Sequence, residues 1–170
     1  CYGHYGQVVG FSATLKPFAY YVQLAGLDGD RVRTAEFASP FPPERRKLLI
    51  IPQVSTRYSR REGNYGRIAE AVERIAALRR GNYFVFFPSF EFLDRVAALF
   101  HPPEGFVVLR QERGMKAAGF EAIMEVLRNR KVPTIVFAVQ GGSFSEGMDY
   151  VGETVIGAFV VGPPLPSYDL

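Results

Sequence analysis

Apolar segments alternate with amphipathic segments from residue 65 to residue 161, and this order limits the chain to very few folds. Helical spacing over 65–80 places apolar side chains on one face, and the apolar run 83–88 that follows is typical of a buried strand. The pair recurs, because a helical pattern over 116–129 precedes the apolar run 134–140. Strand, helix and strand in this order form right-handed crossovers, so the sequence predicts an α/β fold with a mostly parallel sheet and helices on both faces.

The remaining elements follow from the same patterns. Ser89 can cap a helix that carries Phe92, Leu93, Val96, Ala97 and Phe100 on one face, and strands are predicted over 106–109 and 154–161. The first 51 residues give shorter patterns, which predict a helix over 16–25 and strands over 7–12, 32–37 and 47–51.

Composition describes an ordinary globular chain. With 170 residues, 48% of them hydrophobic, it has the size of one domain, and a net charge of +3 is too small to indicate a polyanionic partner by itself. Cys1 is the only cysteine, which excludes a disulfide framework or a cysteine-ligated metal site within this chain. No apolar stretch reaches the roughly 18 to 20 residues of a membrane span. We therefore expect no membrane partner and a cytoplasmic location, and both ends read as cuts within a longer protein.

A glycine-rich turn over 139–150 directly follows the apolar run 134–138. It contains Gly141, Gly142 and Ser143 and then the carboxylates Glu146 and Asp149. Loops at the carboxyl ends of parallel strands bind ligands in open α/β sheets, and glycines let backbone N–H groups approach phosphates closely. The alternative is a tight connection between strands that uses glycine for positive φ.

Loops after residues 88, 110 and 140 are expected at the same edge of the sheet. They supply amides, hydroxyls and a guanidinium, a set that suits a phosphate backbone better than an acyl-transfer site: Ser89, Phe90, Gln111, Arg113, Gly114, Gln140, Gly141, Gly142, Ser143, Ser145, Glu146 and Asp149. The stretch from Arg57 to Arg61, interleaved with Tyr58, could follow single-stranded nucleic acid through charge and stacking, or could be a solvated loop. Glu146 and Asp149 fit acid/base work or hydrogen bonding to hydroxyls.

Three segments carry a family resemblance. Gly-Phe-Ser-Ala-Thr-Leu stands at 10–15, Gly-Asn-Tyr-Phe-Val-Phe-Phe-Pro-Ser-Phe at 81–90, and Gln-Gly-Gly-Ser-Phe-Ser-Glu-Gly-Met-Asp-Tyr at 140–150. In this order they resemble helicase motifs III, IV and V of the superfamily 2 DNA helicases related to XPD and DinG. The resemblance extends over essentially the whole chain.

The resemblance implies a RecA-like three-layer sandwich, incomplete at its C-terminal side, that forms the second helicase domain over 17–170. Residues 1–16 would be the last strand of the first helicase domain, with motif III and a linker. The whole protein would be an ATP-dependent 5′-to-3′ DNA helicase of DNA repair or replication, associated with the nucleoid. The resemblance also implies roles for single residues. DNA would be contacted by Ser89, Phe90, Gly141, Gly142 and Ser143, and we expect Arg57 to contact it too. The nucleotide would be faced by Glu146, Gly147 and Asp149, and ATP hydrolysis would be coupled to domain movement by Ser12, Ala13 and Thr14.

Other family motifs are missing from these 170 residues. The phosphate-binding lysine, the Asp-Glu-Ala-His box, the cluster cysteines and the arginine finger of motif VI do not occur here. We therefore expect no catalytic or metal-ligating residue in this chain and no ATP hydrolysis by it alone, although the parent would use ATP and Mg²⁺ and could hold a 4Fe-4S cluster elsewhere. The expected partners are single-stranded DNA, ATP and the first helicase domain, in a monomer. The alternatives are a non-catalytic nucleic-acid-binding module and a nucleotide-binding α/β domain outside the helicases.

Overall fold

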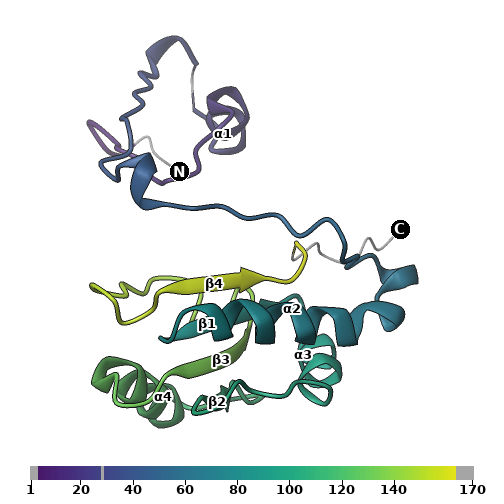
Figure 1. Cartoon of the computed structure of the whole chain (residues 1–170). Coiled ribbons are helices and arrows are strands. Elements are labelled where there is room, and N and C mark those ends of the chain that lie inside the picture. Colours follow the sequence, from purple (N-terminus) through teal and green to yellow (C-terminus); the bar gives the residue numbers. More distant parts are fainter. Residues whose placement is uncertain (1–3, 28, 164–170) are drawn as a thin grey trace. The chain divides into compact units, whose positions relative to one another are not determined.

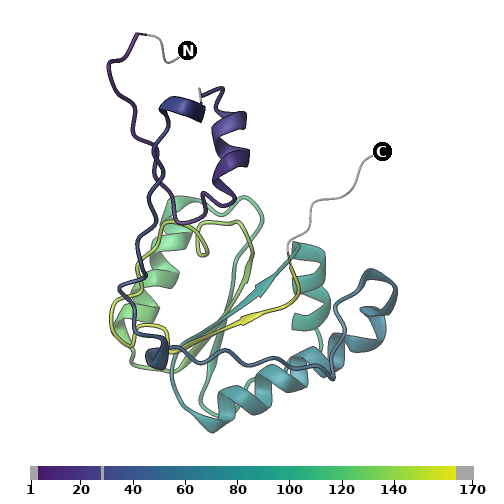
Figure 2. The same ribbon diagram turned by 90° about the horizontal axis from the view of Figure 1, so that it is seen from above.

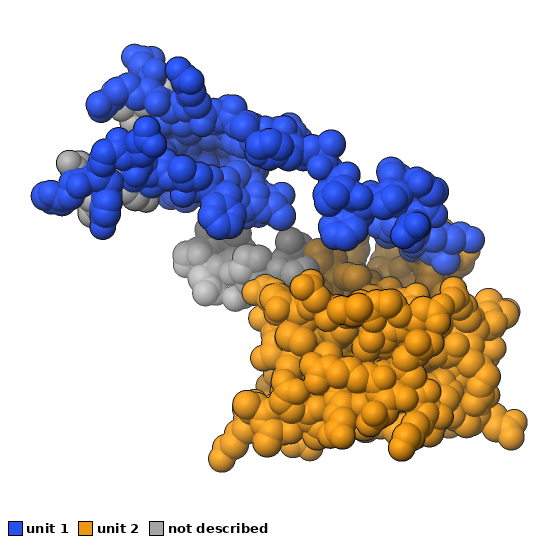
Figure 3. Space-filling view, turned by 90° about the vertical axis from the view of Figure 1, so that its left-hand side faces the viewer, with its two compact units in different colours: residues 1–49 blue, residues 50–170 orange. Residues whose placement is uncertain are grey.

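The computed structural model describes residues 4–27 and 29–163. The chain forms two compact units, residues 1–49 and 50–170 (Figure 3). The assignment of 1–16 and 17–170 to two helicase domains stays a prediction, because the packing within this chain does not test it.

Four parallel strands form the sheet of the second unit (Figure 1). In spatial order they are β2 (Val107–Arg110), β3 (Thr134–Val139), β1 (Tyr83–Phe87) and β4 (Gly157–Val160), and all three pairings are parallel. β1 and β3 are the central strands and are buried along almost their whole length. Burial on both faces explains why these two segments read as continuous apolar runs.

Helices cover both faces of this sheet, as Figure 2 shows. On one face α2 (Tyr65–Leu78) and α3 (Phe90–Ala97) pack with Val85 and Phe87, and on the other α4 (Ala117–Asn129) packs with Phe84 and Val136. Two short 3-10 helices, Tyr58–Arg60 and Glu62–Asn64, precede α2. The predicted three-layer α/β sandwich is therefore confirmed.

The first unit departs from the sequence prediction. Within residues 4–27 and 29–49 it contains the helix α1 (Phe18–Leu24) and the 3-10 helices Gly29–Arg31 and Pro43–Arg45, and no strand. The strands predicted over 7–12, 32–37 and 47–51 are therefore wrong for this chain. Their patterns are strand-like, but a strand forms only where a neighbour receives its N–H and C=O groups, and no described segment does so. Phe11 and Phe37 are accordingly 91% and 89% exposed.

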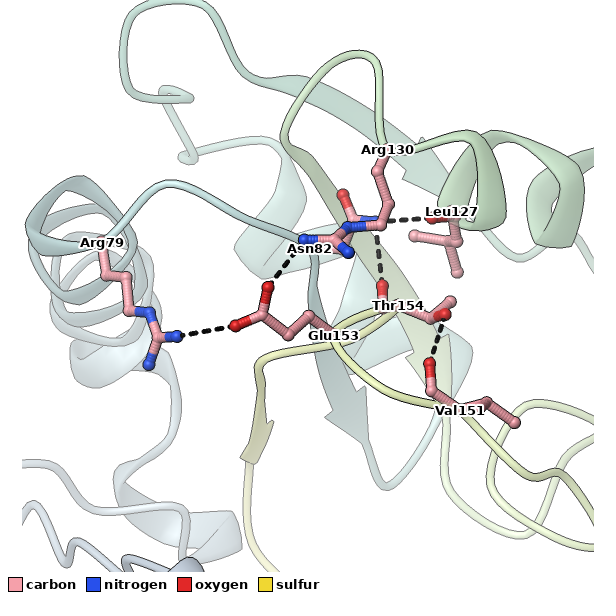
Figure 4. A network of polar contacts seen from close by, with 7 residues as sticks. All are labelled: Arg79, Asn82, Leu127, Arg130, Val151, Glu153 and Thr154. Atoms are coloured by element: carbon pink, nitrogen blue, oxygen red, sulfur yellow. Dashed lines mark hydrogen bonds and ion pairs between the residues drawn. The ribbon is translucent and has the colours of Figure 1, made fainter.

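Asn82 joins three segments at the amino ends of the strands. Its side chain is 3% exposed, and Nδ2 donates to the carbonyl oxygens of Leu127 and Thr154, both at 2.9 Å (Figure 4). Its Oδ1 accepts from the N–H of Thr134 at 3.0 Å. The side chain thus fixes the end of α4, the start of β3 and the turn before β4 with every hydrogen bond made inside the protein.

Glu153 lies beside this network and bridges two arginines. Its carboxylate is 2.8 Å from Nη2 of Arg130 and 3.5 Å from Nη2 of Arg79 (Figure 4). All three side chains are at least half exposed. Exposed ion pairs contribute about 0 to 1 kcal/mol, so the buried amide rather than the ion pairs holds this end of the sheet.

Replacing Asn82 by alanine should lower the free energy of unfolding by about 2 to 4 kcal/mol, because two carbonyl groups and one N–H lose their partner in a buried place. Urea denaturation followed by circular dichroism measures the change. Asn129→Ala, at the exposed end of α4, is the matched control and should change stability by less than about 0.5 kcal/mol. Equal effects of the two substitutions would contradict the assigned role of Asn82.

Candidate functional site

The four strands end nearly level at one edge of the sheet. The register pairs Phe87 of β1 with Val139 of β3, Phe86 with Val160 of β4, and Arg110 of β2 with Phe137. The loops that follow β1, β2 and β3 therefore leave the sheet side by side. The predicted convergence of these loops is confirmed, and we call this region the carboxyl edge: residues 88–90, 111–114, 140–149 and 161–162.

Two glutamines connect the loops of the carboxyl edge. Gln111 accepts from the N–H of Val139 at 2.9 Å through Oε1, and Gln140 donates from Nε2 to the carbonyl oxygens of Gly162 at 2.7 Å and Phe86 at 3.3 Å. Their positions in the sequence place both among the candidates for ligand binding. Their bonds instead tie the loop after β2 to β3 and the end of β3 to the end of β4, so they position the edge.

The glycine-rich turn needs its first two glycines for different reasons. Gly141 has a φ of +70°, a conformation that L side chains rarely adopt. A Cβ on Gly142 would lie 3.1 Å from Nε2 of Gln111 and 3.3 Å from the carbonyl oxygen of Val139, so glycine here leaves room for the glutamine side chain without a shift of either neighbour. Ser143 is exposed, and Ser145 closes the turn by donating from N and Oγ to the carbonyl oxygen of Gly142, both at 2.9 Å.

Phe144 anchors this turn in the core, a role that the motif around it did not reveal. It is 1% exposed, and its ring centroid lies 4.6 Å from that of Phe120 and 5.6 Å from that of Phe84. The hydroxyl of Tyr150 donates to the carbonyl oxygen of Phe144 at 2.7 Å, and burial raises the pKa of Tyr150 above its ordinary value. An aromatic residue inside a glycine and serine loop was the available sequence signal.

The predicted nucleotide-facing residues follow this anchor. Glu146, Gly147 and Asp149 are all exposed, and Gly147 has a φ of +69°. The structure thus places Gly141 to Ser143 before a buried aromatic anchor and the two carboxylates after it. Both groups are accessible to a ligand.

Ser89 and Phe90 lie where β1 passes into α3. The Oγ of Ser89 accepts from the N–H of Phe92 at 3.2 Å, which confirms the predicted helix cap. The cap engages a lone pair, so the O–H is the part of Ser89 that can donate to a phosphate. The guanidinium of Arg113 lies 4.8 Å from the ring centroid of Phe90, and this contact brings the loop after β2 to the start of α3.

The arginine-rich stretch borders the same edge. A Cβ on Gly162, two residues after the end of β4, would lie 2.8 Å from Oγ1 of Thr56. Thr56 directly precedes Arg57, so the arginine-rich stretch begins beside the end of β4. The guanidinium of Arg61 lies 5.0 Å from the ring centroid of Phe92 in the first turn of α3. Arg57 is exposed. The structure therefore brings the predicted DNA-contacting segments of the second unit together.

Ser12, Ala13 and Thr14 belong to the first unit and are exposed. The N–H of Thr14 donates to Oγ of Ser12 at 3.2 Å, which makes a local turn at this motif. Their predicted coupling role depends on other parts of a helicase and stays a prediction.

Side chains that could bind a metal do not cluster in the part of the chain that the structure describes. Residues 4–27 and 29–163 contain no group of three or more His, Cys, Asp or Glu side chains placed to hold an ion. A Mg²⁺ ion that is held by one or two carboxylates and by nucleotide phosphates does not need such a group. Glu146 and Asp149 are exposed and can act as hydrogen-bond acceptors. In the same residues, no helix has the length and apolar character to cross a membrane.

The chain is similar to known helicases in both sequence and structure. A family model described as the helicase C-terminal domain matches residues 72–170. The "Probable ATP-dependent helicase MJ0942" of Methanocaldococcus jannaschii is 28% identical over 171 residues, which are 94% of this chain and 24% of that protein. A solved structure named as an XPD helicase is similar with a TM-score of 0.52 and 20% identity, over 68% of this chain and 20% of that one. The likeness shows a RecA-like fold, and the matches confirm the resemblance drawn from the three motifs.

Tyr150→Phe should lower the free energy of unfolding by about 1 kcal/mol, because the carbonyl of Phe144 loses its donor. Tyr20→Phe, an exposed tyrosine of α1, is the control and should have no measurable effect. Burial raises the pKa of Tyr150 in the folded state above that in the unfolded chain, which is about 10. The contribution of the neutral phenol to the free energy of unfolding is therefore complete below about pH 10 and is lost as the pH rises through the raised pKa. Urea denaturation between about pH 8 and pH 11 should therefore show a shallower alkaline loss of stability in Tyr150→Phe.

Proposed function

Because the chain belongs to the helicase C-terminal domain family, whose model matches residues 72–170, we propose that it is the second RecA-like domain of an ATP-dependent DNA helicase. The chain spans 24% of the length of its relative from Methanocaldococcus jannaschii, so the activity, substrates and partners of a whole helicase are part of this proposal. The observation that carries it is the convergence of the loops after β1, β2, β3 and β4 with the arginine-rich stretch at one edge of the sheet.

The first half of the proposal assigns the DNA backbone to the carboxyl edge. Backbone N–H groups of Gly141 and Gly142, the hydroxyl groups of Ser143 and Ser89, and the guanidinium groups of Arg113 and Arg57 are the donors that phosphate oxygens accept from. Phosphate oxygens are the same in every nucleotide, so contacts to them carry no sequence information. The edge is therefore suited to binding single-stranded DNA with little sequence preference, as a translocating enzyme requires.

The second half assigns the nucleotide to Glu146, Gly147 and Asp149. Exposed carboxylates accept hydrogen bonds from hydroxyl groups such as those of a ribose, and the exposed backbone at Gly147 carries no side chain. Phe144 lies between Gly141–Ser143 and the carboxylates in the sequence and is buried, and we propose that it couples a displacement at the carboxylates to the glycines. ATP with Mg²⁺ would supply the phosphoryl chemistry when bound, and the residues of this chain would hold and orient the nucleotide.

The resemblance supports the finer parts of the proposal. They are 5′-to-3′ polarity, a role in DNA repair or replication, coupling through Ser12, Ala13 and Thr14, and docking against a first helicase domain. We retain them as proposals on the strength of the motifs at 10–15, 81–90 and 140–150.

Single-stranded DNA should bind the 170-residue chain weakly and with a strong salt dependence. For single strands, the slope of log K against log salt is about −0.7 for each phosphate contact, so Arg113→Ala should weaken binding and reduce the slope by about 0.7. Fluorescence anisotropy of a labelled oligonucleotide over a salt series measures both quantities. Arg74→Ala, which removes an exposed arginine of α2 paired with Glu70, is the control and should leave the slope unchanged.

ATP should not be hydrolysed by the 170-residue chain with or without DNA, because the sequence contains no P-loop lysine and no motif VI arginine to act on the transferring phosphate. Phosphate release measured with a colorimetric assay provides the test, with Asp149→Ala as the companion variant. Turnover that Asp149→Ala abolishes would show that the chain carries a complete hydrolytic site of its own and would overturn this expectation.

A further inference from the structure

Tyr58 presents an aromatic ring to solvent beside the carboxyl edge. The residue is 85% exposed although a tyrosine normally buries much of its ring, and it begins the 3-10 helix Tyr58–Arg60. The guanidinium of Arg61 lies 4.8 Å from its ring centroid. One face of the ring is therefore in contact with the protein, and the other is open.

Arg61 is held between two aromatic rings. Its guanidinium lies 4.8 Å from the centroid of Tyr58 and 5.0 Å from that of Phe92, which is 1% exposed. Its Nε is shielded from solvent and has no hydrogen-bond partner among the described residues. A shielded donor without a partner is unfavourable, so the two cation–π contacts are the interactions that retain the guanidinium here. Arg61 thus connects the exposed ring of Tyr58 to the buried core through Phe92.

The turn that carries Tyr58 is fixed from both sides. Asn64 donates from Nδ2 to the carbonyl oxygen of Arg60 at 2.8 Å and accepts at Oδ1 from the N–H of Ser55 at 3.1 Å. The N–H of Arg60 donates to the carbonyl oxygen of Arg57 at 2.9 Å. These bonds limit the movement of the backbone under Tyr58, so less backbone entropy is lost when a ligand binds there.

The chemistry around the open face fits a nucleobase joined to phosphates. Arg57 and Arg60 lie close to Tyr58 in the sequence and are exposed cations, and the nearest acidic residue in the sequence is Glu62, which follows Arg61. An acidic peptide would use the arginines without the ring, and a single strand uses both, through base stacking and phosphate contacts. We propose that the ring of Tyr58 is a stacking platform for a nucleobase of single-stranded DNA, and that Arg61 is the residue that positions this ring. The inference rests on the proposed function, because the same strand would continue along the carboxyl edge.

Two fluorescein-labelled oligonucleotides of equal length test the inference, one of thymidines and one in which most positions are abasic. Tyr58→Ala should weaken binding of the thymidine strand about ten-fold and leave the abasic strand unchanged, since only the first offers a base to stack. Tyr58→Phe keeps the ring and should bind both strands like the unaltered chain. Tyr20→Ala removes an exposed tyrosine of α1 and is the matched control. Arg61→Ala should reduce the preference for thymidine over abasic strands in the same direction as Tyr58→Ala.

The possible outcomes separate failure of the stacking inference from failure of the proposed function, which is binding of single-stranded DNA. Binding of neither strand by the unaltered chain at low salt would overturn the proposed function, and the inference with it. Binding of both strands with no effect of Tyr58→Ala, or with the same loss for thymidine and abasic strands, would overturn the stacking platform and leave the proposed function intact. A Tyr58→Ala defect in binding of free ATP, with unchanged binding of the thymidine strand, would assign the ring to a nucleotide and also overturn the inference.

Discussion

Parallel pairing of the four strands with level ends is the constraint on which the rest of this domain depends. β1 pairs with β3 on one side and with β4 on the other, so the positions of three loops are set by one central strand. Side-chain amides then complete the arrangement at both ends of the sheet. Asn82 joins three segments at the amino ends, and Gln111 and Gln140 join the loops at the carboxyl ends. The positions of the loops after β1, β2 and β3 follow from this frame.

The glycine-rich turn carries small uncharged groups and carboxylates in one short loop. Phe144 fills the core between Phe84 and Phe120, and the hydroxyl of Tyr150 binds its carbonyl. The residues on either side of this anchor remain accessible, with small and uncharged groups before it and carboxylates after it. A Cβ on Gly141 would lie 4.0 Å from Oε1 of Glu146, so the glycines and the first carboxylate lie close together on either side of the anchor in the sequence. That property suits the proposed role at the boundary between DNA and ATP.

The sequence predicted the second unit closely and the first unit poorly, for one physical reason. Helical spacing in 65–80 and 116–129, and the apolar runs 83–88 and 134–140, reflect burial against segments of this same chain, and the predicted elements formed there. The segments 7–12 and 32–37 carry patterns of the same kind, but a β ladder needs a partner strand, and the described residues provide none. The apolar pattern of a segment predicts which of its side chains are buried. It does not predict whether the same chain contains a partner strand for that segment.

By itself the sequence determined the fold class, the helices and strands from residue 65 onward, the cap at Ser89 and the resemblance to helicase motifs, because all of these depend on residues close together along the chain. Only the tertiary structure decided that Gln111 and Gln140 position the loops, that Phe144 anchors the glycine-rich turn, and that Thr56 and Arg61 bring the arginine-rich stretch to the carboxyl edge. Most of these contacts join residues that are far apart in the sequence, as Thr56 and Gly162 are. Their partners are chosen by the packing of strands and helices, which no local pattern contains.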